Sequence, residues 1–90
     1  MKAALQLRLY VAGNAPNSRL AVGRAKAICD EYFAAGHEME IVDLLEAPER
    51  AMADGIIVTP TLIKLFPLPV QRVIGNLSDT SQVLLVLRGQ

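Results

Sequence analysis

Ninety residues are enough for one small domain with a single hydrophobic core, and too few for a core plus a second module. Hydrophobic residues make up 52% of the chain, which excludes a disordered polypeptide. Because 9 Lys+Arg balance 9 Asp+Glu, no overall electric field draws the chain to nucleic acid or to an anionic membrane, and we expect neither as a partner.

The number of cysteines and the length of the apolar runs indicate the cellular compartment in which the protein folds. The chain has a single cysteine, Cys29, so no intramolecular disulfide can form and a reducing compartment fits best. Gln6 and Arg8 interrupt the first apolar run, and no run has the roughly 20 apolar residues that a membrane span needs. We therefore expect a cytoplasmic protein with one domain over residues 1–90.

The first half of the chain has the pattern of a strand, a helix and a second strand. Leucine and valine alternate with other residues from Leu5 to Val11, which predicts a strand with one buried and one partly solvated face. Asn17 or Ser18 is expected to cap the helix that follows, and Gly36 to close it with a left-handed cap.

The second strand is expected from Met39 to Leu45. A helical crossover between two strands makes them parallel, so this half is a βαβ unit. Pro48 suits the first turn of a short helix, in which Glu49 complements the positive end and Gly55 ends the helix.

An apolar, proline-containing stretch follows. It favours one strand from about Val58 to Leu65 and another from about Val70 to Ile74, since β-branched residues dominate and proline restricts pairing. Residues 62–66 would also tolerate a helix. Ser78 or Asp79 can cap a last helix, although residues 83–87 also have strand character.

The resulting order, βαβαββα, predicts a thioredoxin-like α/β fold with a mixed sheet and helices on both of its faces. Pro60 stands at the start of the third strand, where that fold often has a cis-proline, so we predict a cis bond between Thr59 and Pro60.

Thiol–disulfide chemistry is not supported by the position of the cysteine. A thioredoxin-like oxidoreductase needs a nucleophilic cysteine at the start of the first helix, where the helix dipole lowers its pKa. Residues 14–18 contain no cysteine, and Cys29 lies about three turns further along on the apolar face. We interpret Cys29 as a buried, inert thiol.

Other catalytic and cofactor motifs are absent from the sequence as well. His37 is the only histidine and is placed in a polar loop, without the cluster of ligands that a metal needs. Helix capping explains Ser18 and Ser78 better than nucleophilic catalysis does. Gly13 and Gly75 belong to no nucleotide-binding pattern. We therefore expect no enzyme, no cofactor and no metal. The remaining function is docking of a protein partner on strand faces, sheet edges and the short second helix.

Six blocks of sequence carry a family resemblance. They are LYVAGN at 9–14, PNS at 16–18, IVDL at 41–44, TPTL at 59–62, PLPV at 67–70 and VIGNLSD at 73–79. Together they resemble KaiB, the small circadian-clock protein, over nearly the whole chain. The resemblance implies a non-enzymatic protein that binds the N-terminal ATPase ring of KaiC and, in cyanobacterial clocks, helps to sequester KaiA.

The resemblance also implies metamorphism. In the KaiB family the second half of the chain either takes the thioredoxin-like arrangement, which binds KaiC, or refolds into a ground state that assembles as tetramers. Two such folds must lie within a few kcal/mol of each other. The mixed preferences of residues 62–66 and 83–87 are the counterpart of this property in the sequence.

Departures from the clock-type pattern in the last helix and on the second strand refine this expectation. Val86 and Arg88 stand where clock-type KaiB commonly has glycine and aspartate. Both changes favour the last helix, because glycine and a C-terminal acid destabilise helices. Glu38 and Glu40 make the second strand more acidic than the clock-type edge that contacts KaiA, which argues against carrying KaiA binding over.

We therefore predict a chain held in the thioredoxin-like form, with Pro60, Val86 and Arg88 as fold-determining residues. It should be a monomer, with a tetramer only if the ground-state fold is populated. The expected partner contacts are Asn17, Arg19, Glu38, Glu40, Glu49, Arg50 and Asp54. The alternative is a redox-inactive thioredoxin-like adaptor or sensor module, of the kind that KaiB domains form in histidine kinases or in stress signalling, without a clock role.

Overall fold

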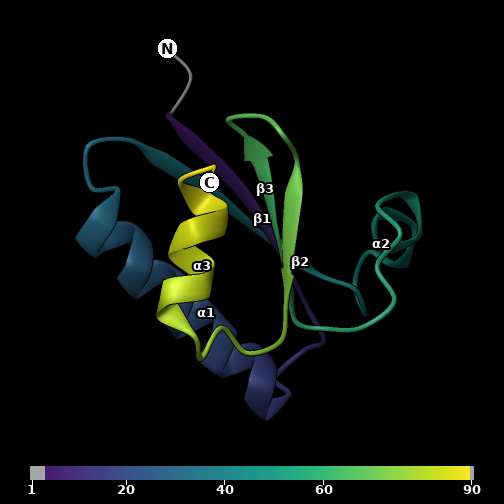
Figure 1. Ribbon diagram of the computed structural model, residues 1–90. Coiled ribbons are helices and arrows are strands. Elements are labelled where there is room, and N and C mark those ends of the chain that lie inside the picture. Colours follow the sequence, from purple (N-terminus) through teal and green to yellow (C-terminus); the bar gives the residue numbers. More distant parts are fainter. Residues whose placement is uncertain (1–3, 90) are drawn as a thin grey trace.

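The computed structural model describes residues 4–89 (Figure 1). Its elements are β1 (Leu5–Val11), α1 (Pro16–Tyr32), β2 (His37–Asp43), α2 (Pro48–Ala53), β3 (Thr61–Phe66), β4 (Gln71–Ile74) and α3 (Thr80–Leu87). This is the order βαβαββα that the sequence predicts.

The four strands form one mixed sheet in the order β2-β1-β3-β4. β1 pairs with β2 in parallel, as the βαβ unit requires, and with β3 in the antiparallel sense. β3 and β4 form an antiparallel hairpin. The two inner strands are therefore β1 and β3, and β2 and β4 are the edges.

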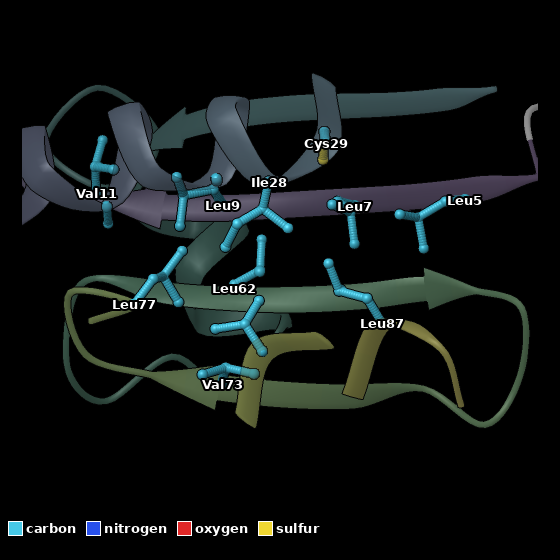
Figure 2. Close-up of a cluster of buried hydrophobic side chains, with 13 residues drawn as sticks. Leu5, Leu7, Leu9, Val11, Ile28, Cys29, Leu62, Val73, Leu77 and Leu87 are labelled. Atoms are coloured by element: carbon cyan, nitrogen blue, oxygen red, sulfur yellow. The ribbon is translucent and has the colours of Figure 1, made fainter. Parts of the chain in front are cut away.

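The main core lies between the sheet and the helices α1 and α3. Alternate side chains of β1 point to this face and meet side chains from the two helices (Figure 2). Its buried members are Leu5, Leu7, Leu9, Val11, Ala21, Ala25, Ile28, Cys29, Leu62, Val73, Leu77, Val83 and Leu87. The prediction that Cys29 is buried is confirmed.

The opposite face of the sheet is covered by α2 and the segments around it. Tyr10, which the alternation places on the partly solvated face of β1, is instead fully buried there with Val42, Ala51 and Ile63. This face of β1 is partly solvated at Gln6 and Arg8, as expected, and it is closed at Tyr10 because α2 lies over it. Helices cover both faces, as predicted.

Lys64 is a buried polar residue on β3. It is 0% exposed, and among residues 4–89 its Nζ atom has no hydrogen-bond partner. Gln71, its register partner on β4, has an Oε1 atom that is likewise buried without a partner in that part of the chain. Gly89, just beyond α3, adjoins Lys64 Nζ.

The two caps expected for α1 were wrong. The helix begins at Pro16 with Ala15 as its N-cap, so Asn17 and Ser18 already lie in the first turn. The buried Ser18 hydroxyl oxygen instead accepts from the Ala12 backbone N–H at 3.1 Å, which fixes the turn before the helix. The helix ends at Tyr32, before Gly36, which has no left-handed φ.

Some strand boundaries also differ from those expected. β2 begins at His37, so this residue is not in a loop, and it ends at Asp43 rather than Leu45. β3 begins only at Thr61, three residues later than expected. The Thr59–Pro60 bond is cis, as predicted. The Phe66–Pro67 and Leu68–Pro69 bonds are also cis.

The two segments with mixed preferences each take one form in this structure. Residues 62–66 are strand and residues 83–87 are helix. The Asp79 carboxylate accepts from the Gln82 backbone N–H at 3.1 Å, so Asp79 is the cap of α3 and Ser78 is not. Burial of Val83 and Leu87 against the sheet supports the helix.

Candidate functional site

Five side chains form a polar cluster between the sheet and α2, which we call the α2 clamp. Arg8 and Tyr10 come from β1, Glu40 from β2, Arg50 from α2 and Asp54 from the residue that ends α2. Arg8 and Glu40 are register partners on the parallel strands, so their side chains lie next to each other on the α2 side of the sheet.

Glu40 lies at the centre of the charged part of the clamp. Its carboxylate accepts two hydrogen bonds from the Arg50 guanidinium, both of 2.7 Å, and one of 2.9 Å from Arg8 Nε. This bidentate arrangement is the strongest geometry for an arginine–carboxylate pair. Hydrogen bonds from Arg50 and then from Arg8 lower the pKa of Glu40 to about 2. The same bonds raise the pKa values of both arginines.

Asp54 joins the clamp to the buried part of the sheet. Its Oδ2 atom accepts from the Tyr10 hydroxyl at 2.6 Å and from Arg8 Nη1 at 3.0 Å. The Tyr10 hydroxyl also lies 3.0 Å from the Arg50 carbonyl oxygen. The hydrogen bond from Tyr10 is the main cause that lowers the pKa of Asp54, while burial is the main cause that raises the pKa of Tyr10.

A third arginine ties the end of α2 to the other edge of the sheet. Arg72 on β4 donates from Nη1 to the Gly55 carbonyl at 3.2 Å and from Nη2 to the Asp54 carbonyl. These carbonyls follow the last turn of α2, where a helix leaves acceptors unsatisfied. Side chains from β1, β2 and β4 therefore converge on one short helix.

Apolar side chains are exposed on α2 and in the segment that follows it. Met52 is 81% exposed, Ile57 94% and Val58 47%. Ala51 is the only residue of the helix that is fully buried. Large exposed apolar side chains on a short helix are typical of contact surfaces rather than of a core.

The start of α1 forms a separate surface. A groove of about 400 Å³ runs between the β1–α1 loop and β2, and it is lined by Val11, Gly13, Asn14, Ser18, Arg19, Val22, Ile41 and Asp43. The Asp43 carboxylate accepts from the Gly13 backbone N–H at 3.0 Å and so shapes the loop beside the groove. Asn17, which is exposed, accepts a hydrogen bond of 3.3 Å from the Asn76 side chain.

The reactive residue types lie outside both surfaces. Cys29 is 1% exposed in the core, and burial raises the pKa of its thiol, with Asp30 adding to the shift. His37 Nδ1 lies 2.9 Å from the Phe33 carbonyl oxygen at the end of α1. Within residues 4–89 no group of three or more His, Cys, Asp and Glu is placed to hold a metal ion. Over the same residues, no helix has the length and apolar character to cross a bilayer.

Comparison with known proteins identifies the family. The model of the KaiB domain matches residues 8–89. The chain is 48% identical over 81 residues to the circadian clock protein KaiB3 of Synechocystis sp., which covers 90% of this chain and 79% of that protein. It is 47% identical to the circadian clock oscillator protein KaiB of Synechococcus elongatus, with the same coverage. The chain belongs to the KaiB family.

The fold is thioredoxin-like, as predicted. The N-terminal domain of Synechococcus elongatus SasA superposes with a TM-score of 0.79 and 26% identity, covering 100% of this chain and 89% of that one. Mitochondrial thioredoxin 3 of Saccharomyces cerevisiae superposes with a TM-score of 0.78 at 11% identity, covering 98% and 80%, and shows the fold alone. Within the KaiB family, this chain is therefore seen here in its thioredoxin-like arrangement.

The three residues expected to determine the fold occupy distinct places in this KaiB-family structure. Pro60 is buried at the start of β3. Val86 is half-buried and packs against the main core, and Arg88 is the C-cap of α3, with its guanidinium 5.6 Å from the centre of the Tyr32 ring. A cation over an aromatic ring adds a favourable contact between α3 and α1.

The expected contact residues of this KaiB-family chain fall into three groups. The α2 clamp brings Glu40, Arg50 and Asp54 together. Asn17 and Arg19 lie at the start of α1, and Glu38 and Glu49 are exposed on β2 and α2.

Sequence reasoning missed two members of the clamp, Arg8 and Tyr10. The signal that could have found them is the charge at Arg8 inside an otherwise apolar strand, on the same face as Tyr10.

Proposed function

We propose that this KaiB-family chain is a non-enzymatic clock protein that binds a KaiC-type ATPase ring and modulates the phosphorylation and ATPase cycle of that ring. The curated relatives are named as circadian clock proteins, and the family model matches residues 8–89. The observation that carries the proposal is the thioredoxin-like arrangement of the second half, with β3, β4 and α3 all formed. That arrangement is the one expected to bind such a ring.

The absence of catalysis is part of the proposal. Cys29 is buried in the core with a raised pKa, and residues 14–18 at the start of α1 contain no cysteine. A nucleophilic thiol must be accessible and ionised, and Cys29 is neither. The single cysteine also fits the cytoplasm, the compartment that the proposal assigns to the protein.

We place the contact with the ring at the start of α1 and on α2. Asn17, Arg19 and Glu49 are exposed, so a partner can reach them, although Asn17 also accepts a hydrogen bond from the Asn76 side chain. Arg50 and Asp54 are already bonded within the clamp, and they support the surface of α2 in addition to any contact of their own.

A binding titration with the purified cognate KaiC-type ring tests the proposal. The wild-type protein should bind, and charge reversal by Arg19→Glu or Glu49→Lys should weaken binding while the unfolding midpoint stays unchanged. Lys26→Glu, an equal reversal at an exposed position further along α1, is the matched control and should bind like the wild type. No binding by the wild type overturns the proposal. Unchanged affinity in both contact variants moves the contact elsewhere.

A second candidate function is a redox-inactive adaptor or sensor module. The likeness to the N-terminal domain of SasA, a part of a longer protein, favours it. A pull-down from the host that recovers a kinase and no KaiC-type ATPase would support this alternative. An insulin-reduction assay should show no activity under either function, and turnover would instead indicate a thiol–disulfide enzyme.

A further inference from the structure

Both a small apolar contact through Ala51 and a set of polar contacts hold α2 in place. Five of the six residues of this helix are exposed or half-buried, and Ala51 alone is fully buried. A helix of this length is not stable by itself in water, so its position depends on tertiary contacts. The polar part of those contacts comes from the α2 clamp and from Arg72.

Glu40 connects Arg50 on α2 to Arg8 on the central strand β1. It is on edge strand β2, yet its carboxylate is bonded to Arg50 on α2 at 2.7 Å and to Arg8 on β1 at 2.9 Å. Arg8 then bonds Asp54 at 3.0 Å, at the C-terminal end of the same helix. Removing the charge of Glu40 therefore releases Arg50 and frees one arm of Arg8 while leaving the core untouched.

We propose that Glu40, Arg8 and Tyr10 are positioning residues for partner binding, which act through Arg50 and Asp54 to hold α2 in its binding position. The inference rests on the proposed function, because it assumes that α2 contacts the ring. A surface that is already ordered loses less conformational entropy on binding than one that must first be ordered. The clamp thus raises the affinity without touching the partner.

Hydrogen exchange tests the positioning step without any partner. The amides of Asp54 and Ile56, which donate to Arg50 and Ala51 at 3.0 and 2.9 Å, report on the end of α2. In Glu40→Gln these amides should exchange about three- to tenfold faster, the range expected for loss of one ion-pair network, while the Leu9 amide in the central strand is unchanged. Glu38→Gln, on the same strand and exposed, is the matched control and should exchange like the wild type.

Binding to the KaiC-type ring tests the consequence. Glu40→Gln should lose affinity by about the same factor as its α2 amides lose protection, since both measure the ordering of one element. Glu40→Asp, which keeps the charge, should recover part of both effects. A role in overall stability alone would instead speed the exchange of the Leu9 amide by the same factor as that of the Asp54 and Ile56 amides.

Each outcome of the two measurements decides a different point. Unchanged exchange at Asp54 and Ile56 in Glu40→Gln overturns the positioning of α2. Faster exchange with unchanged affinity overturns the link to binding. If the wild type does not bind the ring, the proposed function fails, and the exchange result alone then decides whether Glu40 positions α2.

Discussion

The Tyr10 hydroxyl donates to the Asp54 carboxylate over 2.6 Å, from the middle of the sheet to the end of α2. The two residues are 44 positions apart in the chain, and Tyr10 is 0% exposed. This bond links the buried cluster beneath α2, to which Tyr10 belongs, to the charged residues of the α2 clamp.

Removal of this hydroxyl should destabilise the protein. Tyr10→Phe leaves the Asp54 carboxylate without its shortest hydrogen bond, so we expect a loss of about 1–2 kcal/mol of unfolding free energy. The pKa of Asp54 should rise at the same time. Urea unfolding and a carboxylate NMR titration measure the two effects. Tyr32→Phe, at an exposed tyrosine, is the control. A Tyr10→Phe protein as stable as the wild type would contradict the assigned role.

Acid should loosen the clamp. The pKa of Glu40 is lowered from 4.5 to about 2 in the folded protein, so its contribution to stability is complete above pH 4.5 and is lost as the pH falls toward 2. The groups that face Glu40 are Arg8 and Arg50, which stay charged, and the pKa of neighbouring Asp54 is lowered as well.

Urea unfolding between neutral and low pH checks this prediction. The wild type should lose stability below about pH 4.5, and Glu40→Gln should lose less over the same interval. Because Glu40 is half-exposed, solvent screening keeps the difference small. Identical pH profiles for the two proteins would show that Glu40 makes no pH-dependent contribution.

Cys29 should be unreactive in the native state. Burial and the raised pKa both reduce the thiolate fraction, which is the reactive form. A thiol reagent at neutral pH should label the native protein only as fast as it opens, and the unfolded protein at once. Rapid labelling of the native protein would show that the thiol is accessible, and thiol–disulfide catalysis would again be a candidate function.

Changes in α3 should alter the balance between the two folds expected of the family. Val86→Gly lowers helix propensity by up to about 0.5–1 kcal/mol, and Arg88→Asp puts an acid at the negative end of the helix, at a cost of about 0.3–1 kcal/mol. The wild type should be a monomer with one set of amide resonances. The double variant should show a second set, or tetramers by sedimentation. Val86→Ala removes packing without adding glycine, and it should keep one set. A second set in the wild type would contradict the prediction.

The buried lysine should be dispensable for stability. Lys64 Nζ has no hydrogen-bond partner within residues 4–89, and desolvation of an ammonium is costly. Lys64→Met keeps most of the side-chain volume, so we expect unchanged or higher stability, by up to about 1 kcal/mol. Lys26→Met at an exposed site is the control in the same unfolding assay. A clear loss in Lys64→Met alone would show that the ammonium is stabilising.

Local sequence patterns predicted the helices and strands well. They failed to predict burial and capping where a distant segment, or an earlier helix start, determines them. The alternation from Leu5 to Val11 gives β1 directly, and Asp79 as a cap follows from its place before α3. The alternation could not show that Tyr10 is buried, because α2, some 40 residues later, covers it. Ser18 was misassigned as a cap because Pro16 starts the helix earlier.

The clamp could be predicted only in part for the same reason. Glu40, Arg50 and Asp54 were each expected to bind a partner, yet in the fold they bind one another and Arg8. Their meeting depends on the parallel register of β1 and β2 and on the position of α2. The spacing of these residues along the chain predicts neither the register nor the position of α2.

The edge strand β2 bears on self-association. Glu38 is exposed along it and Asp43 ends it, while the Glu40 carboxylate is paired with Arg8 and Arg50. Two copies that paired edge to edge here would bring like charges together, which is a recognised protection of open sheet edges. The formal net charge is +0, so overall repulsion between copies is weak near neutral pH. We therefore expect the placement of the Glu38 and Asp43 carboxylates, rather than the total charge, to disfavour extension of the sheet by a second molecule.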